Sequence, residues 1–331
     1  MALWAGMLVG VVPLATEAAT IVWGNSATQF STGANWSGGV APANDLTTDI
    51  GSFQAATVSF NPQLTASRSI NGLEFTSGTG AWTFSGSSGT RVLTLGASGI
   101  VSNDDSTQTF NQGNLGIALG ANAAFTSNST GALSFGSTLA SFNQSTFTLT
   151  LGGTSTNASN AIGKVIAGSG GLIKSGTGTW TLSGVNTRTG AVTINAGTLS
   201  VATIGDGGVA GNLGQATNAA GNLVLGGGTL QYTGATASTN RNFTLTTGTT
   251  STIDVTTNNL TISGASTNTT GGLTKAGAGT LTLSGANLYT GNTTVSAGTL
   301  AYGVSNALSS GNVTVSGGSV SCIQLCKPSS Y

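Results

Sequence analysis

The stretch GGLIKSGTGTWTLSGVNTRTGAVTINAGTL, residues 170–199, recurs without a gap as GGLTKAGAGTLTLSGANLYTGNTTVSAGTL at residues 271–300. Every position of the first copy maps onto the second at an offset of 101, so that Lys174 corresponds to Lys275 and Asn186 to Asn287. A long-period repeat of this kind is typical of solenoids, in which each unit buries its apolar face against its neighbours. The repeat therefore predicts one elongated structure rather than two compact domains.

Charged residues make up only 5% of the 331 residues, with 8 basic and 8 acidic side chains and a formal net charge of zero. Such a surface has no basic patch for nucleic acid and no polybasic stripe for an anionic membrane. Disordered chains combine low hydrophobicity with high net charge, whereas this chain is 38% apolar with a mean hydropathy of +0.21. We therefore expect a folded protein that does not bind nucleic acid.

Apolar residues recur in i, i+2 pairs, which is the period of a half-buried β-strand. Glycine, asparagine and serine clusters separate these pairs and permit tight corners. Short strands, frequent corners and a long repeat favour an all-β parallel β-helix with about 20–25 residues per coil. A β-sandwich is the main alternative, and a membrane barrel fits less well because its strands are longer. The pairs include Leu73/Phe75, Trp82/Phe84, Leu133/Phe135, Trp180/Leu182, Leu223/Leu225 and Leu281/Leu283.

The two ends of the chain differ from the rest. The apolar run from Ala2 to Ala15 is too short for a membrane span and predicts a signal peptide over residues 1–19, cleaved near Ala18 or Ala19, although no basic residue precedes it. A misassigned start or a first strand are the alternatives. The two cysteines, Cys322 and Cys326, lie in residues 321–331, which we expect to be an atypical tail; a bridge between them requires a turn.

Catalytic groups are scarce. The chain has no histidine, which excludes Ser-His-Asp and Cys-His sites, and no serine stands three residues before a lysine. Asp104 and Asp105 are the one adjacent carboxylate pair, and we expect them in a solvated loop. Asp206 lies in a single IGDGG motif, whereas calcium repeats need tandem copies.

Lysines and tryptophans also have structural explanations. We expect Lys174 and Lys275 to face solvent near coil corners, where they discourage edge pairing, and a contact to an external ligand is the alternative. Trp23, Trp36 and Trp82 would cap the first coil, with a carbohydrate platform as the alternative. We accordingly predict no catalytic, cofactor-binding or metal-binding residue and no cofactor.

The pattern GGL-x-K-x-G-x-GT-x-TLSG-x-N-x-x-TG-x-x-T-x-x-AGTL resembles the autotransporter-associated β-strand repeat, also called the passenger-associated transport repeat. The similarity extends over about residues 20–320, including the segment from Leu225 to Val255 between the copies. It implies a right-handed parallel β-helix of pectin-lyase-like architecture, exported to the bacterial surface, in which the repeats assist passage across the outer membrane. A C-terminal translocating barrel, which autotransporters carry, has no room before Tyr331.

The resemblance and the residues together predict four segments: the signal peptide at 1–19, an N-terminal cap with coils at 20–165, a β-helix with repeats at 170–201 and 271–302 within 166–320, and the tail at 321–331. The expected function is a non-enzymatic, secreted or surface-exposed scaffold, with no membrane span in the mature chain. Export machinery of the outer membrane, or a separate barrel, is the implied partner. An adhesin that binds surface glycans is the second hypothesis, and a polysaccharide lyase or hydrolase is the third.

Overall fold

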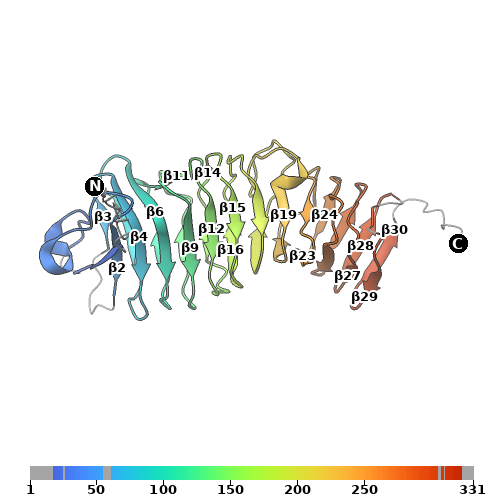
Figure 1. Ribbon diagram of the computed structural model, residues 1–331, viewed down its shortest axis with the longest axis horizontal. Helices are drawn as coiled ribbons and strands as arrows, with labels where there is room; N and C mark the ends of the chain where they lie inside the picture. The colour runs from blue at the N-terminus through green and yellow to red at the C-terminus, as the bar shows by residue number, and fades with distance from the viewer. Residues whose placement is uncertain (1–17, 25–26, 55–60, 305–306, 309, 323–331) are drawn as a thin grey trace, which may run out of the picture.

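The computed structural model describes residues 18–24, 27–54, 61–304, 307–308 and 310–322. These residues form a parallel β-solenoid of about 11 turns, in agreement with the predicted right-handed β-helix. Figure 1 shows the strands stacked side by side along one axis, with the N-terminal segment at one end of the rod and β30 at the other. Every pairing between named strands of the described chain is parallel, which rules out the sandwich alternative.

Three sheets form the walls of the rod. The 13-stranded sheet branches at the long strand β6, which pairs with both β8 and β9. It contains β1 (Ala19–Val22), β2 (Asp49–Phe53), β4 (Arg68–Phe75), β6 (Arg91–Ser102), β8 (Leu115–Leu119), β9 (Ala123–Ser127), β11 (Ser141–Asn143), β12 (Leu149–Gly152), β14 (Ile166–Ala167), β15 (Leu172–Lys174), β17 (Val192–Ile194), β19 (Leu223–Leu225) and β22 (Thr244–Leu245).

The other two sheets run along the same axis. The 12-stranded sheet contains β3 (Gln63–Leu64), β5 (Thr83–Gly86), β7 (Gln108–Phe110), β10 (Leu133–Phe135), β13 (Ala161–Ile162), β16 (Thr179–Leu182), β18 (Thr198–Val201), β20 (Thr229–Tyr232), β23 (Thr250–Val255), β25 (Gly272–Ala276), β27 (Thr293–Val295) and β29 (Val313–Val315). The 5-stranded sheet contains β21 (Ala237–Thr239), β24 (Asn259–Ile262), β26 (Thr280–Leu283), β28 (Thr299–Tyr302) and β30 (Ser319–Cys322). Three short 3-10 helices complete the described elements: η1 (Gly33–Asn35), η2 (Ser37–Gly39) and η3 (Ala220–Asn222).

The core follows directly from the alternation in the sequence. In β16 the side chains of Trp180 and Leu182 are buried, while Thr179 and Thr181 between them are only partly buried. The same inner row continues through Leu199 in β18 and Leu230 in β20, which occupy the same register as Trp180. Each rung therefore covers the apolar row of the preceding rung, as a solenoid requires.

The two sequence copies do not stack on the same faces. The first places β15 and β17 in the 13-stranded sheet and β16 and β18 in the 12-stranded sheet. The second places β25 and β27 in the 12-stranded sheet and β26 and β28 in the 5-stranded sheet. The offset of 101 residues is thus not a whole number of turns, and the second copy is rotated by one face relative to the first.

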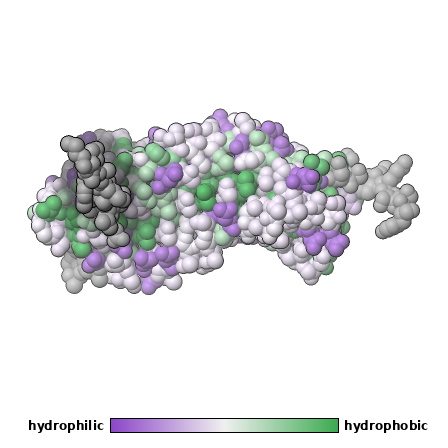
Figure 2. Space-filling view, viewed as in Figure 1, coloured by the Kyte–Doolittle hydropathy of each residue, from purple (hydrophilic) through white to green (hydrophobic). Residues whose placement is uncertain are grey.

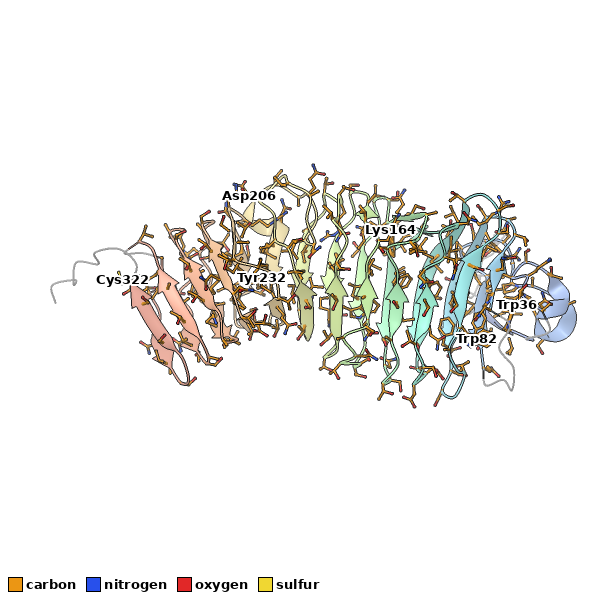
Figure 3. All side chains as sticks on the ribbon, turned by 180° about the vertical axis from the view of Figure 1, so that it is seen from behind. Trp36, Trp82, Lys164, Asp206, Tyr232 and Cys322 are labelled. Carbon is orange, nitrogen blue, oxygen red and sulfur yellow. The ribbon has the colours of Figure 1, made fainter. Side chains whose placement is uncertain are left out.

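The N-terminal end is closed by aromatic side chains. Trp23, Phe30 and Trp36 are buried. Trp36 makes edge-to-face contacts with the other two, with its ring centroid 4.9 Å from that of Trp23 and 5.0 Å from that of Phe30. The Trp36 indole N–H donates to the Phe30 carbonyl at 2.7 Å. In Figure 3, Trp36 and Trp82 lie at this end of the rod and Cys322 at the opposite end.

Candidate functional site

Each repeat buries a lysine at the corner after its first strand. The Lys174 ammonium group donates to the carbonyl oxygens of Ser175 at 2.6 Å, Gly176 at 2.9 Å and Ala196 at 3.2 Å. The first two acceptors lie in the lysine's own turn, and the third lies in the corner of the next coil. Lys275 makes the corresponding bonds to Ala276, Gly277 and Ala297 at 2.6, 2.8 and 3.2 Å. We call this arrangement the lysine clasp.

The clasp corrects the expectation that these two lysines face solvent. Both side chains are fully buried, because three converging carbonyl groups satisfy all three N–H donors of an ammonium ion. Burial lowers the pKa of Lys174 from 10.5 to about 8, and burial lowers the pKa of Lys275 to about 8 although Asp254 opposes the shift. The alternative role, a contact to an external ligand, fails for the same reason.

A glycine closes each clasp from the next coil. Gly197 has a φ of +61°, and a Cβ at this position would lie 2.4 Å from the carbonyl oxygens of Gly176 and Gly178 and 2.7 Å from the Lys174 nitrogen. Its equivalent, Gly298, has a φ of +62°, and a Cβ there would lie 2.4 Å from the carbonyl oxygens of Gly277 and Gly279. The AGTL that ends each repeat thus allows two corners to approach closely enough for one ammonium group to bridge them.

A buried asparagine joins three successive coils. The Asn186 side chain accepts from the Ile166 amide at 2.8 Å in the preceding coil and donates to the Asn212 carbonyl at 2.7 Å in the following one. Asn287 likewise accepts from Ser266 at 2.8 Å and donates to Ala307 at 2.6 Å. The invariable LSG-x-N of the two copies therefore provides a second link between coils.

After the first repeat, residues 202–219 form an insertion that contains no strand and interrupts the regular coils. In Figure 1 it is drawn in yellow, where the chain bulges from the rod. Two buried arginines hold it in place. Arg188 donates to the Leu213 carbonyl at 3.1 Å, and Arg241 donates to the carbonyls of Gly205 at 2.8 Å and Gly214 at 2.7 Å. Burial, followed by repulsion from Arg241, lowers the pKa of Arg188 to about 10.

The second repeat has a tyrosine where the first has Arg188. Tyr289 is fully buried, with its hydroxyl 2.7 Å from that of Thr293, and its coil has no such insertion. The segment GNLVLGGGTL begins 51 residues after Gly170, at Gly221, whereas GNVTVSGGSV begins 40 residues after Gly271, at Gly311. The first copy is thus separated from this segment by 11 more residues than the second copy is. This difference in spacing can be read from the sequence, and it marks the insertion, which was not predicted.

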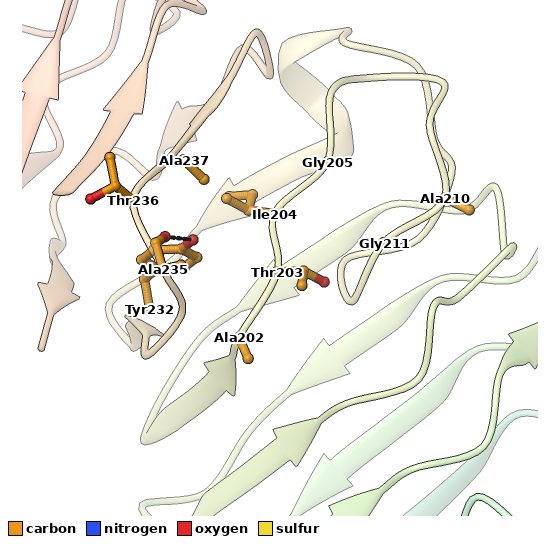
Figure 4. Close-up of a pocket in the computed structure, with 10 residues that line it drawn as sticks. All are labelled: Ala202, Thr203, Ile204, Gly205, Ala210, Gly211, Tyr232, Ala235, Thr236 and Ala237. Carbon is orange, nitrogen blue, oxygen red and sulfur yellow. Dashed lines mark hydrogen bonds between the residues drawn. The ribbon is translucent and has the colours of Figure 1, made fainter. Parts of the chain in front are cut away.

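A small pocket of about 280 Å³ lies between the insertion and the next coil. Figure 4 shows the loop from Ala202 to Gly211 facing the loop after Tyr232, whose hydroxyl donates to the Ala235 carbonyl. The lining is uncharged and consists mainly of small side chains: Ala202, Thr203, Ile204, Gly205, Ala210, Gly211, Tyr232, Ala235, Thr236 and Ala237. It is suited to an uncharged group rather than to an ion.

Comparison with known sequences identifies the motif. The passenger-associated transport repeat family matches residues 172–201 and 273–301. The chain carries two passenger-associated transport repeats. The clasps described above are therefore structural features of this repeat as it occurs here, and the resemblance inferred from the sequence is confirmed.

The same chain is 41% identical over 130 residues, or 38% of its length, to the adhesin BmaC autotransporter of Brucella suis biovar 1 (strain 1330). The aligned part covers 4% of that relative. No solved structure matches the chain significantly. The strand register and the repeats are therefore the evidence for the fold.

The adjacent carboxylates of Asp104 and Asp105 do not converge. Asp104 is buried, contrary to the expected solvated loop, and accepts from the amides of Thr79 at 2.5 Å and Ser106 at 2.7 Å. Asp105 is exposed, as expected, and accepts from Thr130 at 2.9 Å. Hydrogen bonds, above all from Ser129, lower the pKa of the Asp105 carboxyl. The two carboxyl groups therefore lie in different surroundings, one buried and one exposed.

Metal ligands do not gather either. Within the described chain, no group of three or more histidine, cysteine, aspartate or glutamate residues could hold a metal ion. Asp206 lies in the insertion, where it accepts from the Asn240 amide at 2.8 Å. The predictions of no catalytic, cofactor-binding or metal-binding residue remain predictions.

The remaining sequence expectations concern the aromatic residues and the two ends. Trp23, Trp36 and Trp82 are buried, so their rings form no exposed carbohydrate platform, and their role as a cap of the first coil stays a prediction. Strand β30 continues to Cys322, which is disulfide-bonded, while Cys326 and most of the predicted tail lie outside the described residues. The signal peptide at 1–19 lies almost wholly outside them as well. Among the described helices, none has the length and apolar character needed to cross a membrane.

Proposed function

We propose that this chain is a non-enzymatic scaffold within a secreted or surface-displayed passenger, and that its transport repeats promote export by making each coil complete the polar contacts of the coil before it. The lysine clasp carries the proposal. Ala196 and Ala297 belong to the coil that follows their lysines, so the buried charge is fully bonded only after the next coil has folded.

This order favours folding in steps along the axis. A newly emerged coil gains hydrogen bonds and apolar contacts from the preceding one, as in other one-dimensional repeat proteins. Folded coils outside a membrane resist backward sliding of the chain, because withdrawal would leave buried polar groups without partners. The match to repeats named for passenger transport supports this mechanism.

The test measures surface appearance of the full-length parent protein after a pulse of synthesis. Lys174→Met together with Lys275→Met should slow export, while Lys164→Met, which removes a lysine outside the clasps, should not. Equal export rates for the double variant and the parent would contradict a role of the clasps in transport.

A deletion provides an independent measurement. Leu273 pairs with Thr293, so removing residues 273–292 deletes one coil and its lysine while keeping the remaining strands in register. We expect slower export from this deletion than from removal of residues 149–171, the coil between the paired residues Leu149 and Leu172, which lacks a clasp lysine. Similar rates for both deletions would indicate that coil number, not the repeat, matters.

The proposed location is the outside of the cell or its surface, with outer-membrane export machinery or a barrel as the partner. A relative described as an autotransporter adhesin supports this location. Protease added to intact cells should remove the passenger from the parent protein, and complete protection of the passenger in cells with an active export pathway would contradict the assignment.

An adhesin is the second candidate, supported by the name of that relative and by the pocket beside the insertion. Surface glycans remain the proposed ligands. Ala237→Trp fills the pocket from one side, and Val209→Ser changes the exposed tip of the insertion without filling it. Glycan-array binding that is lost in the first variant and retained in the second would favour adhesion through this pocket; binding unchanged in both would place any adhesive surface elsewhere.

A further inference from the structure

The outer face of the 12-stranded sheet carries a straight row of threonines, which we call the threonine row. Thr179 in β16 pairs with Thr198 in β18, which pairs with Thr229 in β20, and no register shift interrupts these pairings. The row continues in the same register through the following strands of the sheet with Thr252, Thr274, Thr294 and Thr314. Figure 1 shows these strands following one another along the rod. The threonines therefore repeat at the rung spacing of about 4.8 Å.

Comparison of the two repeats shows that this face selects threonine. Because the second repeat is rotated by one face, equivalent positions lie on different sheets. Ile173 lies in β15 of the 13-stranded sheet, whereas its equivalent in the second repeat, Thr274, belongs to the threonine row. Val224 in β19 of the 13-stranded sheet likewise corresponds to Thr314. An apolar residue of the first repeat is thus a threonine where the position turns to the 12-stranded sheet.

Strand propensity is the alternative explanation, because threonine is common in β-strands. The column two residues further along the same strands argues against it. Residues in that column vary from strand to strand: Thr181, Ser200, Gln231, Asp254 and Ala276. The row also persists across the insertion, where 31 residues separate Thr198 from Thr229. Propensity alone does not account for a row that is constant beside a column that is not.

The hydroxyl groups of the row are free to contact a ligand. The side chains from Thr179 to Thr294 are partly exposed, and Thr314 is exposed. Among the described residues, no hydrogen bond from another protein group involves the hydroxyls of the row, whereas that of Thr181 donates to the Ala158 carbonyl at 3.4 Å. Each threonine hydroxyl donates one hydrogen bond and accepts two, and it stands beside an apolar methyl group. The row is therefore an uncharged, evenly spaced array of hydroxyl and methyl groups.

We propose that the threonine row binds the surface of ice. A face of an ice crystal presents water molecules at a fixed repeat close to the rung spacing, so successive threonines meet equivalent positions of the lattice. The sheet fixes the spacing of the hydroxyls before contact, which lowers the ordering cost of binding. Ice is uncharged, and so is the row. This activity goes beyond the proposed role in export.

A crystalline polysaccharide such as cellulose also presents hydroxyl groups at a regular repeat. Sugar rings, however, bind best where their C–H faces can stack on exposed aromatic rings. The aromatic residues in the strands of this sheet all point into the core and are buried: Phe84, Phe110, Phe135, Trp180 and Tyr232. The outer face lacks a stacking platform, which favours ice over a polysaccharide.

The experiment measures ice recrystallisation, and the temperature gap between melting and growth of a single ice crystal, in solutions of the purified full chain. We expect the unchanged chain to slow recrystallisation and to open this gap. Thr252→Tyr with Thr274→Tyr should lose both effects, because two rings in the row hold the ice away from the other threonines. The matched control is Thr150→Tyr with Thr193→Tyr, in β12 and β17 of the 13-stranded sheet, which should keep both effects.

A second variant does not depend on whether bulky rings are tolerated. Thr229→Lys with Thr294→Lys adds flexible side chains that extend into solvent from the outer face, and it should also lose both effects. Urea midpoints and circular dichroism establish that each variant is folded. An unchanged chain without effect on ice overturns the proposal, and so does an equal loss in the control. A chain that sediments with cellulose or chitin powder but leaves ice growth unaffected would assign the row to a polysaccharide instead.

Discussion

At the residue scale, the lysine clasp shows how a charged side chain contributes to a core with few charges. Lys174→Met keeps the length and apolar stem but removes three donors from buried carbonyl groups of two corners. We expect a loss of about 1–3 kcal/mol in the free energy of unfolding, measured with urea, because unbonded buried carbonyls keep their desolvation penalty. Lys164→Met is the matched control and should change stability by about 0.5 kcal/mol or less. A stabilised Lys174→Met variant would show that the buried charge costs more than its bonds contribute.

The same groups determine a pH dependence. The folded chain releases the protons of Lys174 and Lys275 at pH values of about 8, whereas the unfolded chain holds them up to 10.5. Between these values the unfolded state binds more protons, so the free energy of unfolding should rise with pH. Urea midpoints measured from a pH of about 7 to about 10 should therefore increase, and the slope should flatten in the variant lacking both lysines. A midpoint that falls over this window in the unchanged chain, but not in that variant, would mean that both pKa values are raised.

Glycine at the clasp has a steric role that can be separated from its backbone conformation. Gly197 and Gly208 both have positive φ, at +61° and +84°, but an added Cβ meets close carbonyl groups only at Gly197. Alanine should cost about 1–2 kcal/mol at either position through backbone strain, and a further 1–3 kcal/mol at Gly197 through the clash. Equal unfolding free energies for the two variants would contradict the close approach of the corners.

At the element scale, the insertion is a loop arranged around guanidinium groups. Arg241 donates to Gly205, Ala216 and Gly214 within it, and neutral substitution would leave these carbonyls without that donor. Arg241→Met should therefore increase hydrogen exchange across residues 203–219 while leaving β4 to β12 unchanged. Arg91→Met, at a partly buried arginine bonded to Ser87, is the control. Protection of the insertion that persists in Arg241→Met would assign its order to apolar packing instead.

Sequence reasoning predicted the strands better than the corners. The Trp180/Leu182 and Leu281/Leu283 pairs are buried as expected, because a two-residue period needs only local information. The buried lysines were missed because a general rule places charge outside, and only the fold brings Ala196 to Lys174. The rotation of the second copy by one face relative to the first could not be predicted from the sequence either. Successive rungs differ in length, for example 19 residues from Trp180 to Leu199 but 31 from Leu199 to Leu230. The number of residues between two strands therefore does not tell which sheet each strand joins.

At the scale of the whole molecule, the two halves of the rod are stabilised by different contacts. The aromatic ring pairs of the described chain run from Trp23 to Phe142 and include stacked contacts of Phe110 with Phe84 at 4.6 Å and with Phe135 at 4.8 Å. The second half instead contains the clasps and mainly aliphatic inner rows. Aromatic pairs contribute about 0.5–1.5 kcal/mol each beyond the area that they bury. The first half should therefore open less often than the second.

A rod in which each rung touches only its neighbours should respond locally to a change in its core. Phe110→Ala, at a cost of about 3–5 kcal/mol, should speed hydrogen exchange in β5, β7 and β10 and leave β24 and β26 unaffected. Leu281→Ala, at about 2–5 kcal/mol, should do the reverse, with its effect extending toward β30, because Val313, Val315 and Val320 in that region are only partly covered. In the unchanged chain, exchange should become faster from β7 toward β30. Uniform acceleration of all rungs by either variant would show that the solenoid opens as one cooperative unit, and stepwise folding during export would then lose its physical basis.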